Sequence, residues 1–243
     1  MKLMSGSGKG IKRDENQDRV MTAFLDENTA LAVLCDGMGG QNAGSEASST
    51  AIEIIADVIQ RGYSSCRSTD DIYELVNSAI IAANDLIFDI SSKDNDKFGM
   101  GTTCVVAVIR PGRAYIANVG DSRGYLLSDG RLIQITTDHS VVRAMVERGE
   151  ITEEQAKSHP RRNYITRAIG VVRELNIDFF DVDDIEFTAV MLCSDGLSGF
   201  TEMRAVEERL CSPDDSGGLI DSLIELARQS GSTDDTTVAI VMV

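Results

Sequence analysis

The stretch Leu31-Ala-Val-Leu-Cys-Asp-Gly-Met-Gly-Gly40 and the stretch Ala189-Val-Met-Leu-Cys-Ser-Asp-Gly-Leu-Ser-Gly199 share one plan. In each, a short apolar run ends in Asp-Gly, and a hydrophobic residue and a glycine follow. Such a run predicts a buried β-strand that stops at the Asp-Gly pair. Two strands that end in the same way favour a fold in which these ends lie together where two sheets meet.

Further apolar runs, bounded by Gly and Asp, have the residues typical of strands. The full set is Ala30–Cys35, Thr102–Ile109, Ala114–Asn118, Gly124–Leu127, Leu132–Ile135, Phe187–Cys193 and Thr236–Val243. The turns Arg110-Pro-Gly-Arg113 and Ser128-Asp-Gly-Arg131 each join two of these runs and predict hairpins.

Three segments place apolar residues at helical spacing: Ser45–Arg61, Asp70–Ile90 and Ser216–Ser230. Consecutive hairpins with a few long helices are typical of antiparallel sheets that pack together with helices outside, so the sequence predicts an α+β fold. A length of 243 residues is at the upper end of one compact domain, and we expect residues 1–243 to form a single domain.

The chain is strongly acidic, with 39 Asp and Glu against 23 Lys and Arg and a formal net charge of −16. Nucleic acids and anionic membranes both attract clustered Lys and Arg, so this charge argues against either as a partner. Most of the acidic side chains are expected to be solvated surface. A minority is expected to bind a cation.

The cysteines and the N-terminus bear on the cellular compartment. The five cysteines are odd in number and contain no Cys-x-x-Cys pair, so a disulfide framework is not expected. Residues 1–13 have no apolar signal core, and no later run approaches a membrane span. These features predict a cytoplasmic protein.

Residues 141–172, termed the flap segment below, differ from the rest of the chain. They are polar and partly basic, with two small helical pieces and the dipeptide His159-Pro160. This composition predicts an insertion or lid rather than a core element.

Several carboxylates follow predicted strands or precede one: Asp36, Asp121, Asp195 and the pair Asp234-Asp235. A single carboxylate in such a place is most often a turn former. If these strand ends converge, however, the anions cannot all stay ionised without a counter-charge. Basic residues near them are few, which favours a metal ion.

The available ligands are oxygens, because two histidines and scattered cysteines do not make a nitrogen or sulfur site. Oxygen ligands favour Mg²⁺ or Mn²⁺ over zinc, and Gly37 would let its own backbone carbonyl reach an ion. A pair of metals held by carboxylates suits hydrolysis at phosphorus. Arg13, five residues before Asp18, could hold a phosphate with its planar guanidinium, although alone it is typical of a solvated surface charge.

These motifs resemble those of the metal-dependent protein serine/threonine phosphatases of type 2C, the bacterial branch in particular. The matching pieces occur in the family's order and cover nearly the whole chain. They are Gly10-Ile-Lys-Arg-Asp-Glu-Asn-Gln-Asp18, Asp36-Gly-Met-Gly-Gly40, Gly101-Thr-Thr103, Gly120-Asp-Ser-Arg123, Thr137-Asp-His-Ser140, Arg148-Gly-Glu-Ile-Thr152, His159-Pro-Arg-Arg-Asn163, Ser194-Asp-Gly-Leu197 and Gly231-Ser-Thr-Asp-Asp-Thr-Thr237.

The resemblance implies a four-layer α-β-β-α sandwich of two antiparallel sheets flanked by helices, with a flap and with metals in a cleft at one end. It implies hydrolysis of phosphoserine and phosphothreonine in proteins, with two core Mn²⁺ or Mg²⁺ ions and a third. By position, Asp36, the Gly37 carbonyl, Asp195 and Asp234 would hold the core ions, and Asp121 with Asp195 the third. Asp18 would orient the attacking water, and Arg13 would hold the substrate phosphate.

Three departures from the family pattern affect this expectation. Met38 stands where some relatives have His, so no imidazole can protonate the leaving alkoxide. Gln17 stands where others have Glu, and Asp235 replaces a frequent Asn. Gln17 removes one possible anionic contact to the metal site. Asp235 adds negative charge near the ion, and we expect that to alter metal affinity more than to abolish activity.

Three other functions compete with a general protein phosphatase. One is a pseudophosphatase that only binds, against which the intact Asp36, Asp195, Asp234 and Arg13 argue. Another is a plain cation-binding regulatory domain, but the calcium-loop pattern Asp-x-Asp-x-Asp-Gly with a distal Glu is not present. The third is a phosphatase dedicated to one regulatory protein. The family expectation is a monomer that acts on phosphorylated proteins, among them a Ser/Thr protein kinase and its substrates.

Overall fold

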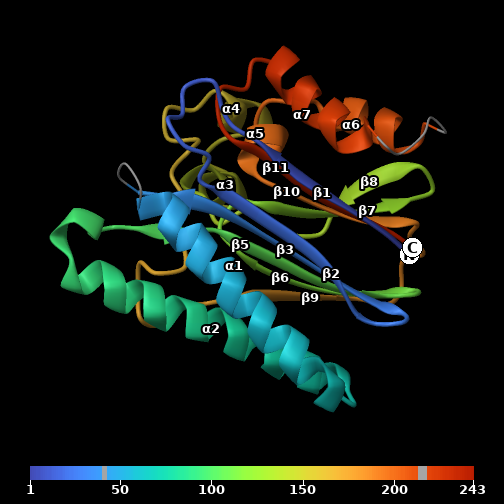
Figure 1. Cartoon of the computed structure of the whole chain (residues 1–243). Helices are drawn as coiled ribbons and strands as arrows, with labels where there is room; N and C mark the ends of the chain where they lie inside the picture. Colours follow the sequence, from blue (N-terminus) through green and yellow to red (C-terminus); the bar gives the residue numbers. More distant parts are fainter. Residues whose placement is uncertain (40–42, 213–217) are drawn as a thin grey trace.

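The computed structural model describes residues 1–39, 43–212 and 218–243, in which two antiparallel sheets stack face to face with helices on both outer sides (Figure 1). This is the α-β-β-α order that was predicted. Gly40 and residues 216–217, which belong to a predicted motif and a predicted helix, lie outside the described residues.

The six-stranded sheet has the order β2-β3-β5-β6-β9, with the short β4 paired to the end of β3. Its strands are β2 (Asp18–Asp26), β3 (Thr29–Met38), β4 (Gly101–Thr102), β5 (Cys104–Arg110), β6 (Arg113–Val119) and β9 (Asp178–Val182). The five-stranded sheet has the order β1-β11-β10-β7-β8. Its strands are β1 (Lys2–Gly8), β7 (Arg123–Ser128), β8 (Arg131–Gln134), β10 (Ala189–Cys193) and β11 (Thr236–Met242).

The long helices α1 (Ala43–Gly62) and α2 (Thr69–Lys93) cover the six-stranded sheet, and α6 (Met203–Leu210) and α7 (Leu219–Gln229) cover the other sheet (Figure 1). The short α3 (Val141–Glu147) and α4 (Glu153–Lys157) of the flap segment lie at one end of the sandwich, near the one-turn helix α5 (Asp195–Ser198). Two short 3₁₀ helices, Tyr63–Ser65 and Asn95–Lys97, flank α2.

Each pair of adjacent layers encloses its own apolar core, and β3 contributes to two of them. Ala30, Ala32 and Leu34 point between the sheets, while Leu31 and Val33 point toward α1 and α2. A strand buried on both faces needs apolar residues at every position, which explains the unbroken run in its sequence. A third core lies between the five-stranded sheet and α5–α7.

Helix α2 qualifies the expectation that no run approaches a membrane span. It has 25 residues and a mean hydropathy of 1.2 over its most apolar window, so length and composition alone would let it cross a membrane. Its buried residues, Ile72, Val76 and Ile80 among them, instead pack in the core beneath α1. The helix begins with a capping box in which Ser68 and Asp71 each bond the other's backbone N–H.

Among the described elements, no prediction was made for β1, β2, β9, α5, α6 or the two 3₁₀ helices. Residues of β1 and β2 are mixed in polarity, and β1 is an edge strand, with only serine and glycine over residues 5–8, that pairs with β11. The helix predicted from Ser216 is described from Leu219, and the strand predicted from Phe187 starts at Ala189.

Candidate metal centre

The predicted site residues from both sheets meet at one end of the sandwich. Asp36 lies near the end of β3, Asp121 follows β6, and Asp195 begins α5 after β10. Asp18 opens β2, and Asp234 precedes β11. The antiparallel register brings these ends together, because β2 starts where β3 stops, with Asp18 directly opposite Asp36.

The backbone of Asp36 is held by the Gly-Thr-Thr motif. Thr103 N–H donates to the Asp36 carbonyl at 2.9 Å, and Thr102 Oγ1 donates to the same oxygen at 2.8 Å. The Asp36 N–H donates to Thr103 Oγ1 at 3.1 Å, and Thr103 Oγ1 lies 2.8 Å from Ser122 Oγ. This network ties the end of β3 to the turn that carries Asp121.

Gly37 is required by close packing. A Cβ built at this position would lie 2.1 Å from the carbonyl oxygen of Gly44 and 2.6 Å from that of Gln17. Only glycine lets β3, α1 and the segment before β2 approach this closely.

Asp234 and Asp235 have different partners. Asp234 Oδ1 accepts from Arg13 Nε at 2.7 Å and forms an ion pair with Arg13 Nη2 at 2.6 Å. Asp235 is buried, and its two oxygens accept the N–H groups of Gly10 and Gln17, both at 2.8 Å. Asp235 therefore fixes the loop that carries Arg13 onto the start of β11.

Burial and mutual repulsion raise the pKa values of the clustered carboxyl groups. Burial raises the pKa of Asp18 to about 7; the hydroxyls of Thr237 and Ser194 oppose this shift, and the charges of Asp235 and Asp195 add to it. The pKa of Asp36 is raised well above its ordinary value by burial and by four neighbouring aspartates, Asp18 first among them.

The same forces act on the half-buried carboxyls of Asp195 and Asp121. Burial and then Asp234 raise the pKa of Asp195 to about 6, against the effect of a hydrogen bond with Asp36. Burial, Asp195 and Asp138 raise the pKa of Asp121 to about 8. A positive charge among these groups would remove the repulsion that raises these pKa values.

The donor set fits a hard divalent cation. Asp18 Oδ2 is buried and has no hydrogen-bond partner among the residues that the structure describes, which is an unusual state for a carboxylate oxygen. The clustered groups offer oxygen ligands, the type preferred by Mg²⁺ and Mn²⁺. Within the described ranges, however, no three Asp, Glu, His or Cys side chains are already grouped as a chelating set. Arg13 holds Asp234.

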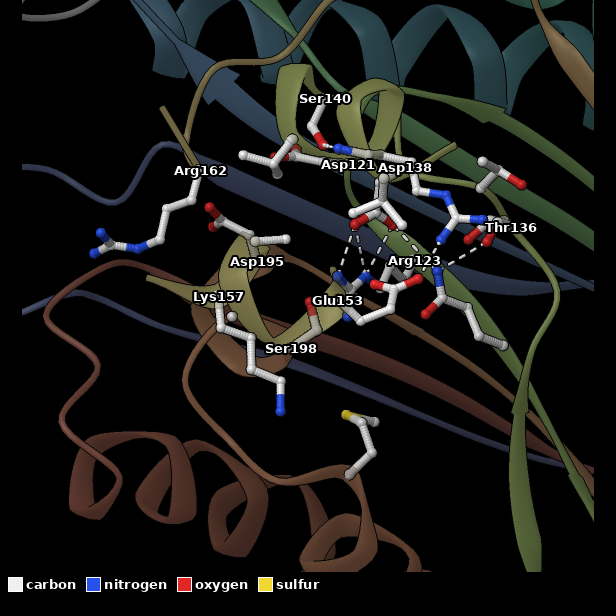
Figure 2. Close-up of a pocket in the computed structure, with 18 of the residues that line it drawn as sticks. Asp121, Arg123, Thr136, Asp138, Ser140, Glu153, Lys157, Arg162, Asp195 and Ser198 are labelled. Carbon is white, nitrogen blue, oxygen red and sulfur yellow. Dashed lines mark hydrogen bonds and ion pairs between the residues drawn. The ribbon is translucent and has the colours of Figure 1, made fainter. Parts of the chain in front are cut away.

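Asp121 and Asp195 also line a cavity of about 740 Å³ that extends beneath the flap segment. Figure 2 shows both carboxylates at this cavity, with Lys157 and Arg162 of the flap segment beside them and Arg123 bonded to Asp138. Arg123 binds Asp138 through two nitrogens, Nε to Oδ1 at 2.9 Å and Nη2 to Oδ2 at 2.6 Å. Asp36 and Arg13 are not among the residues that line this cavity.

Sequence reasoning gave no role to Thr103, Ser194, Arg123 or Asp138. Thr103 bonds Asp36 directly, and Arg123 and Asp138 pair with each other beside Asp121. Ser194 Oγ accepts the N–H of Thr237 at 3.0 Å and so joins the end of β10 to β11. All four residues lie inside the motifs that resemble the family, and this could have pointed to them. Asp178, the partner of His139, lies outside every one of those motifs.

Gln17 and Asp235, two of the residues that depart from the family pattern, contact each other in the structure. Gln17 is buried, its N–H donates to Asp235 Oδ2, and its side-chain Oε1 lies 3.4 Å from Arg13 Nη1. The chain therefore places its negative charge on residue 235, where two backbone N–H groups receive it, and a neutral amide on residue 17.

Comparison with known proteins identifies what this arrangement is similar to. Residues 6–235 match the protein phosphatase 2C family. The serine/threonine phosphatase stp of Listeria monocytogenes serotype 4b (strain F2365) is 35% identical over 233 residues, which are 96% of this chain and 92% of that protein.

Two solved structures have the same fold. The serine/threonine phosphatase Stp1 from Staphylococcus aureus superposes with a TM-score of 0.89 at 30% identity, over 99% of this chain and 94% of that one. The catalytic domain of the serine/threonine protein phosphatase PstP, solved in complex with two manganese ions, gives a TM-score of 0.82 at 32% identity. The match covers 98% of this chain and 96% of that domain.

Proposed function

The chain belongs to the protein phosphatase 2C family and is a protein serine/threonine phosphatase that uses Mn²⁺ or Mg²⁺, and we propose that the carboxylates at the junction of the two sheets carry its chemistry. The observation that carries this proposal is the convergence of Asp18, Asp36, Asp121 and Asp195 from both sheets, with mutually raised pKa values. In the proposal, Asp36, the Gly37 carbonyl, Asp195 and Asp234 hold two core ions. Asp121 and Asp195 hold a third.

When bound, such ions lower the pKa of water toward neutrality and neutralise the phosphate oxygens. The side chain of Asp18 orients the attacking water. Its buried Oδ2, which has no partner within the described ranges, can accept a hydrogen bond from that water.

Arg13 binds the phosphate of the substrate in this proposal. Its guanidinium is partly exposed, with a side-chain exposure of 40%, and it points to Asp234 at the edge of the cluster. Since Asp234 cannot serve the guanidinium and a cation fully at the same time, phosphate oxygens take its place on Arg13. The side chain of Met38 cannot donate a proton to the leaving oxygen, so water supplies that proton.

The wider assignments extend the same proposal. Residues 1–243 act as a single catalytic domain, with residues 141–172 as its flap. The substrates are phosphorylated proteins, among them a Ser/Thr protein kinase and its targets, and the enzyme works as a monomer. The five cysteines are free thiols, which supports a location in the reducing cytoplasm.

Hydrolysis of a phosphothreonine peptide by the purified protein tests the catalytic proposal. Turnover is expected with Mn²⁺ or Mg²⁺, none with EDTA, and a loss of at least about 10³-fold in Asp36→Asn. The Asp129→Asn variant, changed in an exposed hairpin turn, is the matched control and should keep the wild-type rate. A rate in Asp36→Asn near that of the control would exclude the assigned role of Asp36. No turnover with either metal by a folded wild-type protein would favour a pseudophosphatase.

A further inference from the structure

His139 lies at a junction between the turn that carries Asp121, the flap segment and the edge strand β9. It is 5% exposed, and it directly precedes Ser140, the N-cap of α3. The catalytic proposal above assigns this residue no role.

Both backbone polar groups of Gly120 bond to His139. The Gly120 N–H donates to His139 Nδ1 at 3.0 Å, and the His139 N–H donates to the Gly120 carbonyl at 2.9 Å. Gly120 has φ +111°, and a Cβ there would lie 2.6 Å from Thr103 Cβ and Cγ2. The peptide before Asp121 is thus held in a conformation restricted to glycine, against the same Thr103 that anchors Asp36.

The other side of the imidazole ring bonds to β9. Because Nδ1 accepts a hydrogen bond, the neutral ring carries its proton on Nε2, which lies 3.1 Å from Asp178 Oδ2. Arg167 binds the other oxygen of Asp178 through Nη1. The Gly120 N–H therefore sets the tautomer of His139, and Asp178 fixes the orientation of the ring, with Arg167 Nη1 also 3.1 Å from Nε2.

The backbone of His139 continues into the flap segment. Thr166 N–H donates to the His139 carbonyl at 2.7 Å, and Val141 N–H donates to the Tyr164 carbonyl at 2.8 Å. These two bonds lie on either side of an isolated β-bridge between Ser140 and Ile165. The two ends of the flap segment therefore close on the residue that holds Gly120.

We infer that His139 is a positioning residue that fixes the Gly120–Asp121 turn to the root of the flap segment and thereby sets the affinity of the Asp121 site for its cation. The inference rests on the proposed role of Asp121 as a metal ligand. It extends that role from the carboxylate to the residues that aim it.

Two substitutions of similar size separate the hydrogen bond from packing. In His139→Asn, the side-chain Oδ1 can take the place of Nδ1 as the acceptor for the Gly120 N–H. In His139→Leu, no acceptor remains. Amide hydrogen exchange in the metal-free protein should show Gly120 protected in the wild type and in His139→Asn, and exchanging at least about ten-fold faster in His139→Leu.

Calorimetric titration with Mn²⁺ then measures the consequence for the site, with Asp121→Ala as reference. We expect His139→Leu to lower, by about ten-fold, the affinity for the Mn²⁺ ion that Asp121→Ala removes, and to change the affinity for the core ions by no more than about two-fold. His139→Asn should restore most of the lost affinity. Equal effects of the Leu and Asn variants, or parallel loss at every ion, would overturn the inference.

The reference variant distinguishes failure of this inference from failure of the proposal on which it rests. If Asp121→Ala removes no ion, the role of Asp121 is wrong. If it removes one and His139→Leu does not weaken that ion, the role of His139 alone is wrong. Should His139→Leu not fold, ¹⁵N NMR of the wild-type ring decides, since a proton on Nδ1 instead of Nε2 would contradict the bond to Gly120.

Discussion

At the scale of single residues, the buried carboxyl of Asp18 distinguishes this site from an ordinary apolar core. Its carboxyl is buried, one of its oxygens has no partner in the described part of the chain, and its pKa is raised to about 7. A raised folded-state pKa means that the folded protein holds this proton more tightly than the unfolded chain. The resulting stability is complete below about pH 4, the unfolded-state pKa, and is lost as the pH rises through about 7.

Replacing Asp18 with Asn should therefore stabilise the metal-free protein at pH 8, because the amide carries no charge that burial and neighbours oppose. We expect a gain on the order of 2–4 kcal/mol in the free energy of unfolding at pH 8 and little change at pH 4. Urea denaturation in EDTA measures both values. A destabilised Asn variant at pH 8 would contradict the raised pKa, and the same substitution should slow turnover with Mn²⁺.

Replacing Arg13 with Ala should raise KM for phosphorylated peptides by about 10- to 100-fold with a smaller change in kcat, because the guanidinium binds the phosphate group. Lys12→Ala removes the adjacent exposed charge and is the control. A similar rise of KM in both variants would indicate that the two positive charges attract the phosphopeptide only through general electrostatics. An unchanged KM in Arg13→Ala would remove Arg13 from the phosphate site.

Sequence reasoning at this scale found the carboxylates but not the residues that aim them. Asp36 and Asp195 could be predicted because each ends an apolar run with Asp-Gly. The bond from Gly120 to His139 could not, because it joins residues 19 positions apart through a turn whose geometry depends on Thr103. Asp235 was expected to add negative charge near a metal ion, and its contacts with the N–H groups of Gly10 and Gln17 were not predicted.

At the scale of elements, β3 shows which parts of the fold its sequence determines. Its unbroken apolar run predicted a buried strand, and the structure confirms burial on both faces. Strand β1 has no comparable pattern, since small residues such as Gly6 and Gly8 are selected by contact with Ile220 and Ile224 of α7. Contacts of that kind depend on the tertiary fold and leave no local period in the sequence.

The close approach of β3 and α1 can be tested by adding one methyl group. Gly37→Ala should cost about 1–3 kcal/mol of stability, because its Cβ would meet the carbonyl oxygens of Gly44 and Gln17, and it should reduce turnover by displacing a proposed ligand carbonyl. Gly218→Ala is the matched control, since Gly218 has φ −118° and none of the described atoms lies within 4 Å of the added Cβ. Chemical denaturation should find the control within about 1 kcal/mol of wild type, because Gly218 is the N-cap of α7 and alanine caps a helix less well than glycine. Equal stability of the two variants would contradict this packing.

At the scale of the whole molecule, the two sheets meet at a cluster of like charges in a chain of net charge −16. The pKa values of Asp18, Asp121 and Asp195 are all raised, so the metal-free folded protein binds more protons than the unfolded chain between about pH 4 and 8. Its stability must therefore fall as the pH rises through this range.

Mn²⁺ should reverse this trend, because carboxylates must lose their protons to bind the ion and a ligand that binds only the folded state stabilises it. At an ion concentration of 100 times Kd the gain is about 2.7 kcal/mol per site. Thermal denaturation from pH 5 to 8 should give a falling Tm in EDTA and a level or rising Tm with Mn²⁺. The Asp36→Asn variant should show a smaller response to the ion, and a Tm unaffected by Mn²⁺ at pH 8 would contradict the cluster as its site.

The measurement that tests the central claim most directly is anomalous diffraction at the manganese edge from crystals grown with Mn²⁺. The account predicts anomalous peaks within about 2.0–2.6 Å of carboxylate oxygens of Asp36 and Asp195, at the junction of the two sheets. It also predicts that Arg13 is released from Asp234. Manganese bound elsewhere on the acidic surface, with Arg13 still paired to Asp234 and no peak between Asp36 and Asp195, would contradict it.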